Sequence, residues 1–288
     1  MVRISEYDPW LGIRDFISVP EALVTNTAAL GIAHYDLRFL MTVIVLGLTG
    51  RARYGVAWPV VMASRKDLGD IMGLVPGTIK EKGDRLERAG VLRRGKPTRT
   101  SKTRYDLSPL IRRLASLATE RAPRDKWGRR WRGCGPLVEI PVGLVRKAQD
   151  LGLRDREFGL MLALVVLPGR SPGWPVKALA APQVTGAIGL QPYGVWMGVR
   201  RLRARGLLKI LRRGKHVARY DLSPLVKMLR VVEGSGWGIF GEPEWVARVA
   251  ENRRRAEARA KRRWHSPATG WLDQQPYYMK RQVRARIV

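Results

Sequence analysis

The residues of this chain whose types suggest chemistry are mostly cationic, and they are densest between residues 182 and 219. That stretch holds nine Lys or Arg residues and no Asp or Glu. A cationic stretch without acids is hard to explain as a solvent face stabilised by ion pairs, and it favours contact with a polyanion. The candidate contact residues are those expected on the outer face of a helix and of a following hairpin: Gln191, Tyr193, Trp196, Met197, Arg200, Arg201, Arg203, Lys209, Arg212, Arg213, Lys215 and His216.

Arginine sets the chemistry expected of this stretch, because Arg outnumbers Lys there. A guanidinium group can donate two parallel hydrogen bonds to O6 and N7 of guanine, whereas an ammonium group meets phosphate mainly as a point charge. A binding site that contains G·C pairs is therefore the expectation, although the sequence of that site does not follow from the protein.

A second cationic stretch lies earlier in the chain and differs from the first in its charge balance. Its candidates are Thr78, Lys80, Lys82, Arg85, Arg88, Arg93, Arg94, Lys96, Arg99 and Lys102. This stretch also contains acids, and Glu81 with Arg85 and Asp84 with Arg88 have the spacing of i,i+4 ion pairs. Direct contact with a nucleic acid and a solvated helix stabilised by pairs both remain open. We expect the later stretch to supply more of the affinity.

The two stretches occupy equivalent places in an internal repeat. Residues 104–110 and 219–225 share the sequence RYDLSPL. Upstream, Trp58-Pro59-Val60 matches Trp174-Pro175-Val176, and Gly90 matches Gly206. The chain is therefore predicted to contain two copies of one domain-sized module. We place an N-terminal arm at 1–16, copy one at 17–120, a basic linker at 121–137, copy two at 138–232 and a basic C-terminal extension at 233–288.

Both copies predict the same order of elements. A short helix (20–30 and 141–151) precedes an apolar helix (36–48 and 155–167), and the Trp-Pro-Val segment indicates a strand. Two helices then flank a Gly-Leu-x-Pro turn, at 65–72 and 77–89 in copy one and at 182–188 and 193–205 in copy two. A hairpin with a glycine turn follows, and Ser-Pro opens a closing helix. The fold class is mainly α with small β-hairpins (α+β).

This order is that of a winged-helix domain, a helix-turn-helix followed by a hairpin. The motifs (I/V)-P-x-x-L-V, G-L-x-P and L-x-x-x-G-(V/L)-L recur across residues 17–232. In them the chain resembles the tandem winged-helix replication initiators of plasmids and phages and, more loosely, bacterial winged-helix regulators. The resemblance implies sequence-specific binding of double-stranded DNA at origin repeats, with the second helix of the turn in the major groove. It also implies host replication proteins as partners and no catalysis.

Two other classes of DNA-binding protein remain as alternatives. One is a winged-helix transcriptional regulator, and the other is an architectural or partition protein that coats DNA. A homodimer is compatible with either. Because one chain carries two modules, a monomer could also span two half-sites about 34 Å apart.

Composition narrows the classes of protein further. The formal net charge is +30, from 54 Lys and Arg against 24 Asp and Glu. The lone Cys134 excludes a disulfide framework and a cysteine-rich zinc site, and it fits a reducing compartment. The longest apolar stretches fall short of the roughly 20 residues that span a bilayer, and residues 1–10 lack a signal-peptide pattern. We expect a cytoplasmic, nucleoid-associated protein with no membrane partner.

The enzyme alternatives are weaker than the binding interpretation. Residues 90–96 have P-loop spacing, but Pro97 replaces the hydroxyl residue that would hold magnesium. The three histidines are scattered, so neither a metal nor another cofactor is expected. His216 with Arg219 and a later Tyr277-Tyr278 has the residue types of a tyrosine recombinase, but His216 lies in the repeated hairpin. Asp106 and Asp221 could form a carboxylate pair, yet an Asp two residues before a Ser-Pro helix start is more often a turn or cap residue.

The linker and the C-terminal extension leave two interpretations each. Trp127 and Trp131 in the linker either pack on a module or belong to a basic strap along the DNA backbone. A predicted basic helix at 243–264 either docks on the protein or contacts DNA or another subunit.

Overall fold

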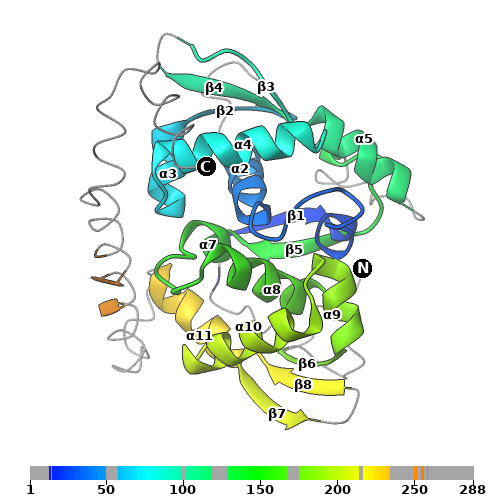
Figure 1. Ribbon diagram of the computed structural model, residues 1–288, viewed down its shortest axis with the longest axis vertical. Helices are drawn as coiled ribbons and strands as arrows, with labels where there is room; N and C mark the ends of the chain where they lie inside the picture. Colours follow the sequence, from blue (N-terminus) through cyan, green and yellow to red (C-terminus); the bar gives the residue numbers. More distant parts are fainter. Residues whose placement is uncertain are drawn as a thin grey trace, which may run out of the picture.

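The computed structural model describes residues 13, 15–49, 58–98, 101–118, 129–167, 175–213 and 217–233, together with 250, 251, 254, 255 and 258. They form helices and small antiparallel sheets, so the expected combination of these elements is confirmed. Figure 1 shows copy one above copy two, with β1 (Phe16–Pro20) and β5 (Leu137–Pro141) between them. None of the helices in the described ranges is long and apolar enough to cross a membrane.

The element order is the same in both copies. In copy one, β1 is followed by α1 (Glu21–Thr25), α2 (Leu37–Thr49), β2 (Val60–Ser64), α3 (Arg65–Met72), α4 (Pro76–Arg88), β3 (Arg93–Arg94), β4 (Lys102–Asp106) and α5 (Ser108–Leu117). In copy two, β5 is followed by α7 (Val142–Arg146), α8 (Asp155–Val166), β6 (Val176–Ala180), α9 (Ala181–Ile188), α10 (Pro192–Ala204), β7 (Lys209–Arg213), β8 (Val217–Asp221) and α11 (Ser223–Val232).

The turns between α3 and α4 and between α9 and α10 form as the sequence predicts. Gly73 and Gly189 end the first helix of each pair with φ of 61° and 63°, a conformation that favours glycine. Pro76 and Pro192 then open the second helix, where a missing N–H is not needed. Each pair is thus two helices joined by a short turn.

The sheet of each copy has three antiparallel strands, in the orders β2-β4-β3 and β6-β8-β7. In both copies, the strand before the helix pair aligns with the second strand of the hairpin. Asp106 and Asp221 stabilise the turn before the last helix of each copy. Asp106 Oδ1 accepts from the Ser108 N–H at 2.9 Å, and Asp221 Oδ1 accepts from the Ser223 N–H at 2.8 Å. They are turn residues, as predicted, rather than a carboxylate pair.

The first helix of each copy is shorter than predicted. We expected helices at 20–30 and 141–151, but α1 ends at Thr25 and α7 ends at Arg146. In copy one, the segment after the helix makes a tertiary contact: the backbone N–H and the hydroxyl of buried Thr27 both donate to the Ala187 carbonyl oxygen, at 3.3 and 2.7 Å. These bonds join the segment after α1 to α9 of the other copy.

The two copies share one core. β1 and β5 pair antiparallel, and the partners Ser18 and Glu139 are also equivalent positions of the repeat, which places a pseudo-two-fold axis at this pair. Ten of the thirteen residues of α2 are buried, and so are ten of the twelve of α8. A helix that is buried on all sides must be covered by more than one neighbour. α2 and α8 contact each other, and one continuous hydrophobic cluster includes both copies.

The described part of the linker packs on the protein. Trp131 is fully buried, and its Nε1 donates to the Ser18 carbonyl oxygen at 3.0 Å. Its ring meets the Trp58 ring edge-to-face at 4.9 Å. Burial raises the pKa of the Cys134 thiol to about 11. The packed alternative therefore holds for Trp131, whereas Trp127 and most of 243–264 lie outside the described residues.

Candidate nucleic-acid interface

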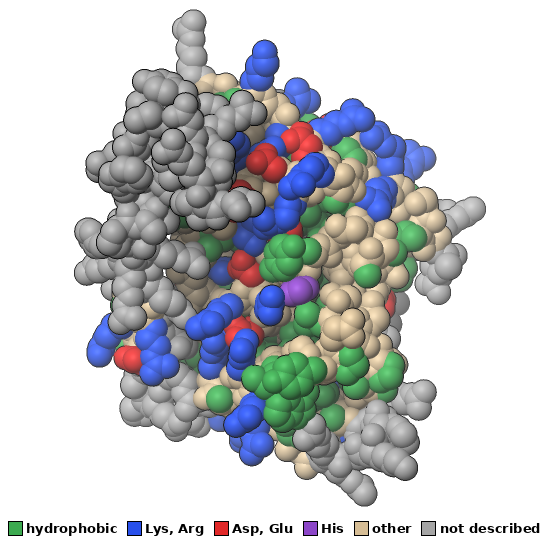
Figure 2. Space-filling view, viewed as in Figure 1, with side chains coloured by type: hydrophobic (Ala, Val, Ile, Leu, Met, Phe, Trp, Pro, Cys, Tyr) green, Lys and Arg blue, Asp and Glu red, His purple; other side chains and the backbone are tan. Residues whose placement is uncertain are grey.

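The outer face of α10 carries the predicted contact residues. Val195, Val199 and Leu202 are buried at the spacing of one helical stripe, and this stripe holds α10 against the body. The opposite side chains therefore project into solvent. The exposed candidates at this end of copy two are Gln191, Tyr193, Trp196, Arg200, Arg201, Arg203 and Lys209, whereas Met197 is half-buried. Figure 2 shows hydrophobic side chains gathered over α10 beside Lys and Arg.

The positive charge on α10 is largely free of acids. Glu157 of α8 is the acid beside it, and this carboxylate is 1% exposed. Arg205 Nη1 lies 2.9 Å from Glu157 Oε2, whereas Arg201 Nη1 is 3.9 Å from Oε1 and its side chain stays 49% exposed. Within the described ranges, Arg200 and Arg203 form no ion pair. Their charge is thus available to an anionic partner.

The hairpin of copy two is described only in part. Lys209 is exposed at the start of β7. Arg212 and Arg213 belong to the same strand, but their side chains are not among those described. Lys215 and His216 lie outside the described residues.

The predicted exposure of Lys82 is wrong. We expected this side chain on the outer face of α4, but it is 3% exposed. Its ammonium lies 2.8 Å from Asp155 Oδ2 and 3.5 Å from Asp36 Oδ1, and it donates to the Tyr35 carbonyl oxygen at 2.5 Å. The spacing carried the signal: Lys82 is three residues after Ile79 and four before Leu86, both buried on the inner stripe. Lys82 therefore joins α4 to α8 and is not a contact residue.

The i,i+4 ion pairs that the spacing along α4 allowed do not form. Arg85 forms its ion pair with Asp36 and not with Glu81, with Nε to Oδ2 at 2.8 Å and Nη2 to Oδ1 at 2.7 Å. A bidentate pair with a 2% exposed carboxylate is stronger than a solvated pair along a helix. The hydrogen bonds that Arg85 donates to the Asp36 carboxylate outweigh burial and raise the pKa of Arg85. Arg85 is consequently held inward, although it remains about one-third exposed.

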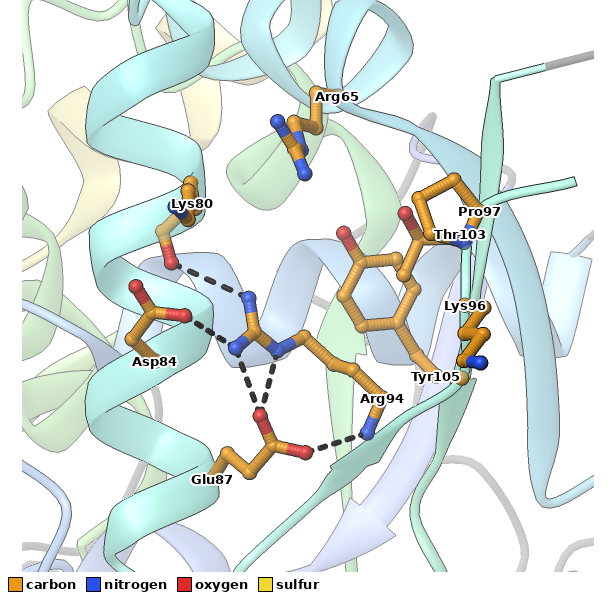
Figure 3. A pocket seen from close by; sticks show the side chains of 10 residues that line it. Arg65, Lys80, Asp84, Glu87, Arg94, Lys96, Pro97, Thr103 and Tyr105 are labelled. Carbon is orange, nitrogen blue, oxygen red and sulfur yellow. Dashed lines mark hydrogen bonds and ion pairs between the residues drawn. The ribbon is translucent and has the colours of Figure 1, made fainter. Parts of the chain in front are cut away.

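Arg94 ties the hairpin of copy one to α4. Figure 3 shows its guanidinium between Asp84 and Glu87, with a further bond to the Lys80 carbonyl oxygen. Nε and Nη2 lie 3.0 and 2.7 Å from Glu87 Oε2, and the Arg94 backbone N–H donates to Oε1 at 2.9 Å. Burial raises the pKa of Glu87, but these bonds outweigh it and lower that pKa. Asp84 therefore pairs with Arg94 instead of Arg88, and Arg94 is occupied within the protein.

Arg94 and its partners Asp84 and Glu87 border a cavity of about 240 Å³ between α4 and the hairpin. Arg65 and Tyr105 line it from the side opposite Asp84 (Figure 3). Copy one keeps four exposed cationic candidates: Lys80, Arg88, Arg93 and Lys96. Thr78 and Lys102 are half-buried, and Arg99 lies outside the described residues. Copy one thus presents fewer exposed cationic side chains than the number of Lys and Arg residues in its sequence suggests.

A network of buried charges that sequence analysis missed positions α4 against copy two. Asp36 and Asp155 stand at equivalent places, just before α2 and at the start of α8. Arg38, 2% exposed, lies 3.4 Å from Asp155 Oδ1 and donates to the Ile71 carbonyl oxygen at 3.3 Å. These partners are far apart in the chain, so local spacing carries no trace of them.

Comparison with protein-family models, with curated proteins and with solved structures found no match to this chain. Across the described residues, no group of three or more His, Cys, Asp or Glu side chains gathers where it could hold a metal ion. The functional interpretation therefore depends on the geometry and charge of the chain itself.

Proposed function

We propose that this chain is a sequence-specific double-stranded DNA-binding protein built from two tandem winged-helix units. In each unit, α3–α4 or α9–α10 is the helix-turn-helix, and β3–β4 or β7–β8 is the wing. The observation that carries the proposal is the exposed cationic face of α10, where Arg200 and Arg203 have no acidic partner in the described part of the chain. Helices of this kind enter the major groove with their outer face toward the bases.

The residues take different roles in this proposal. Arg203 is suited to guanine edges, because its guanidinium donates two parallel hydrogen bonds to O6 and N7. Lys209, at the start of the wing strand β7, is suited to a phosphate. In copy one, Lys80 and Arg88 on α4 and Arg93 and Lys96 on the wing supply backbone contacts. Copy two consequently provides most of the affinity.

We further propose that the biological role is replication initiation at plasmid or phage origin repeats, with host replication proteins as partners. The resemblance of the repeated motifs supports this role. The shared core also supports it, since one chain holds two units in a fixed arrangement that suits a long composite site. A transcriptional regulator would bind at promoters instead, and an architectural protein would bind with little sequence preference.

Selection of binding sites from random duplex DNA at physiological salt, followed by footprinting, tests the proposal. We expect one enriched sequence whose protection covers two successive major-groove faces. An array of such sites at an origin supports the initiator, and single sites at promoters support the regulator. Absence of enrichment, with affinity that collapses steeply as salt rises, would contradict sequence-specific binding and favour coating of DNA.

A further inference from the structure

Three side chains on the outer face of α10 form a row of flat groups. The ring centroids of Tyr193 and Trp196 lie 5.9 Å apart, and the ring planes are tilted by 31°. The guanidinium carbon of Arg200 lies 5.7 Å from the centroid of the Trp196 ring. Positions 193, 196 and 200 have the i, i+3, i+7 spacing that aligns side chains on one helix face. The geometry of the helix therefore sets the row.

The fold leaves both aromatic rings exposed. Tyr193 is 71% exposed and Trp196 is 39% exposed, whereas the packing of α10 is carried by Val195, Val199 and Leu202. Exposed aromatic side chains are a common mark of a binding surface. The repeat offers an internal comparison, because the equivalent positions in copy one are Gly77, Lys80 and Asp84. The row is thus particular to copy two.

We propose, on the premise of the function above, that the Tyr193–Trp196–Arg200 row stacks against unpaired nucleobases of a DNA strand. In an intact duplex, neighbouring pairs cover the faces of each base, and the groove presents only edges and thymine methyl groups. The flat face of an indole or phenol ring finds its complement on an unstacked base. A guanidinium plane stacks on bases in the same way, so Arg200 extends the row.

The charge around the row favours a nucleic-acid strand over a protein surface. Arg200, Arg201 and Arg203 are exposed on the same helix, and α10 contains no acidic residue. Flanking cations that track the phosphates, with aromatic rings between them, are the combination used by proteins that bind single strands. The row therefore lies where copy two would hold an opened segment beside the duplex.

The test compares two labelled DNAs of one arbitrary sequence, a full duplex and the same duplex with a short central bubble of mismatched thymines. Sequence-tolerant binding at low salt makes knowledge of the target unnecessary. The full-length protein should bind the bubble more tightly than the duplex. Trp196→Ala and Tyr193→Ala should each reduce bubble affinity by at least about fivefold, since stacking on one aromatic ring is commonly worth that much or more. Their effect on the duplex should be smaller.

Matched variants separate stacking from charge and from folding. Trp196→Phe keeps an aromatic ring and should retain most of the preference for the bubble. Arg203→Ala removes an exposed charge from α10 outside the row and should weaken both DNAs alike. A 2-aminopurine placed in the bubble should lose fluorescence when the parent protein binds, and Trp196→Ala should restore it.

Four results would overturn the inference. Equal losses on bubble and duplex would assign the rings to the intact groove. Unchanged binding of both DNAs would assign them to another partner, such as a protein. Duplex binding by the parent protein without any preference for the bubble would refute the row as a strand site while leaving the proposed function intact. Failure to bind either DNA would refute both.

Discussion

Glu233 couples a single carboxyl group to the stability of copy two. It follows α11, and its Oε1 accepts the Gly143 N–H at the start of α7 at 3.1 Å. Burial raises the pKa of Glu233 to about 7; the Gly143 bond lowers this pKa and the nearby charge of Asp15 raises it. Because the folded protein holds this proton more tightly than the unfolded chain, stability should fall as pH rises from about 4.5 to about 7.

Glu233→Gln tests this coupling, since an amide keeps the acceptor oxygen and removes the titration. The variant should gain stability relative to the parent as pH rises through that window, by about 1–2 kcal/mol once solvent screening is allowed for, and the gain should level off above pH 7. Urea unfolding of both proteins at pH 5 and pH 8 measures it. The same difference at both pH values would show that Glu233 has an ordinary pKa.

The sequence predicts the exposure of individual candidate residues well only where their charges have no partners. On α10, the stripe of Val195, Val199 and Leu202 fixes the inner face, so the exposure of Arg200 and Arg203 follows from spacing alone. In copy one, the number of cations is misleading, because some are consumed by acids brought close by the fold. Asp36 is 49 residues from Arg85, and no local pattern joins them.

At the scale of elements, Lys82 of α4 pairs with an acid from each copy, Asp36 of copy one and Asp155 of copy two. Lys82→Met keeps the volume but leaves Asp36 and Asp155 without their shared ammonium, and removing one partner from a buried ion cluster costs about 3–5 kcal/mol. Arg85 and Arg38 remain beside these carboxylates, so we expect a loss of about 3 kcal/mol. Chemical denaturation measures the free energy of unfolding.

Lys80→Met is the matched control, on the same helix but with an exposed side chain. It should change the free energy of unfolding by no more than about 0.5 kcal/mol. Similar small effects for both variants would contradict a stabilising role for the cluster. The comparison also matters for function, because reduced DNA binding in a Lys82 variant would report a displaced α4 rather than a lost contact.

The order of elements is predictable because the same pattern of residues occurs in both copies, but not every element has the length that the sequence predicts. Pro, Gly and Ser positions mark the starts and ends of α3, α4, α9 and α10 within a residue or so. The early end of the first helix is common to both copies, at Thr25 and Arg146, and in copy one Thr27 of the following segment then bonds to Ala187 of the other copy. The strand β3 has only two residues, although the Gly95 N–H still donates to the Arg104 carbonyl oxygen at 2.8 Å; Pro97, two residues further on, has no N–H to donate.

At the scale of the whole molecule, the repeat becomes a pseudo-symmetric pair with unequal surfaces. The pairing of β1 with β5 and the shared core hold the two units in one arrangement. Sequence similarity predicts two copies but not their joint packing, for which the only trace is the apolar character of α2 and α8 around their whole circumference. The surfaces have diverged, since copy one pairs much of its charge internally and copy two leaves it exposed.

This divergence predicts an unequal contribution of the copies to DNA affinity. Because Lys82 and Arg85 are held by Asp36 and Asp155, the informative substitutions lie at exposed positions. Arg200→Glu with Arg203→Glu in copy two should weaken duplex binding at least about tenfold more than Lys80→Glu with Arg88→Glu in copy one. Each pair lowers the net charge by the same amount, so the difference reports position rather than total charge.

The number of lost phosphate contacts follows from the salt dependence of the affinity, with a slope change of about one per contact. Equal losses for the two pairs would mean that DNA responds to total charge alone, and the ranking of the copies would then be wrong.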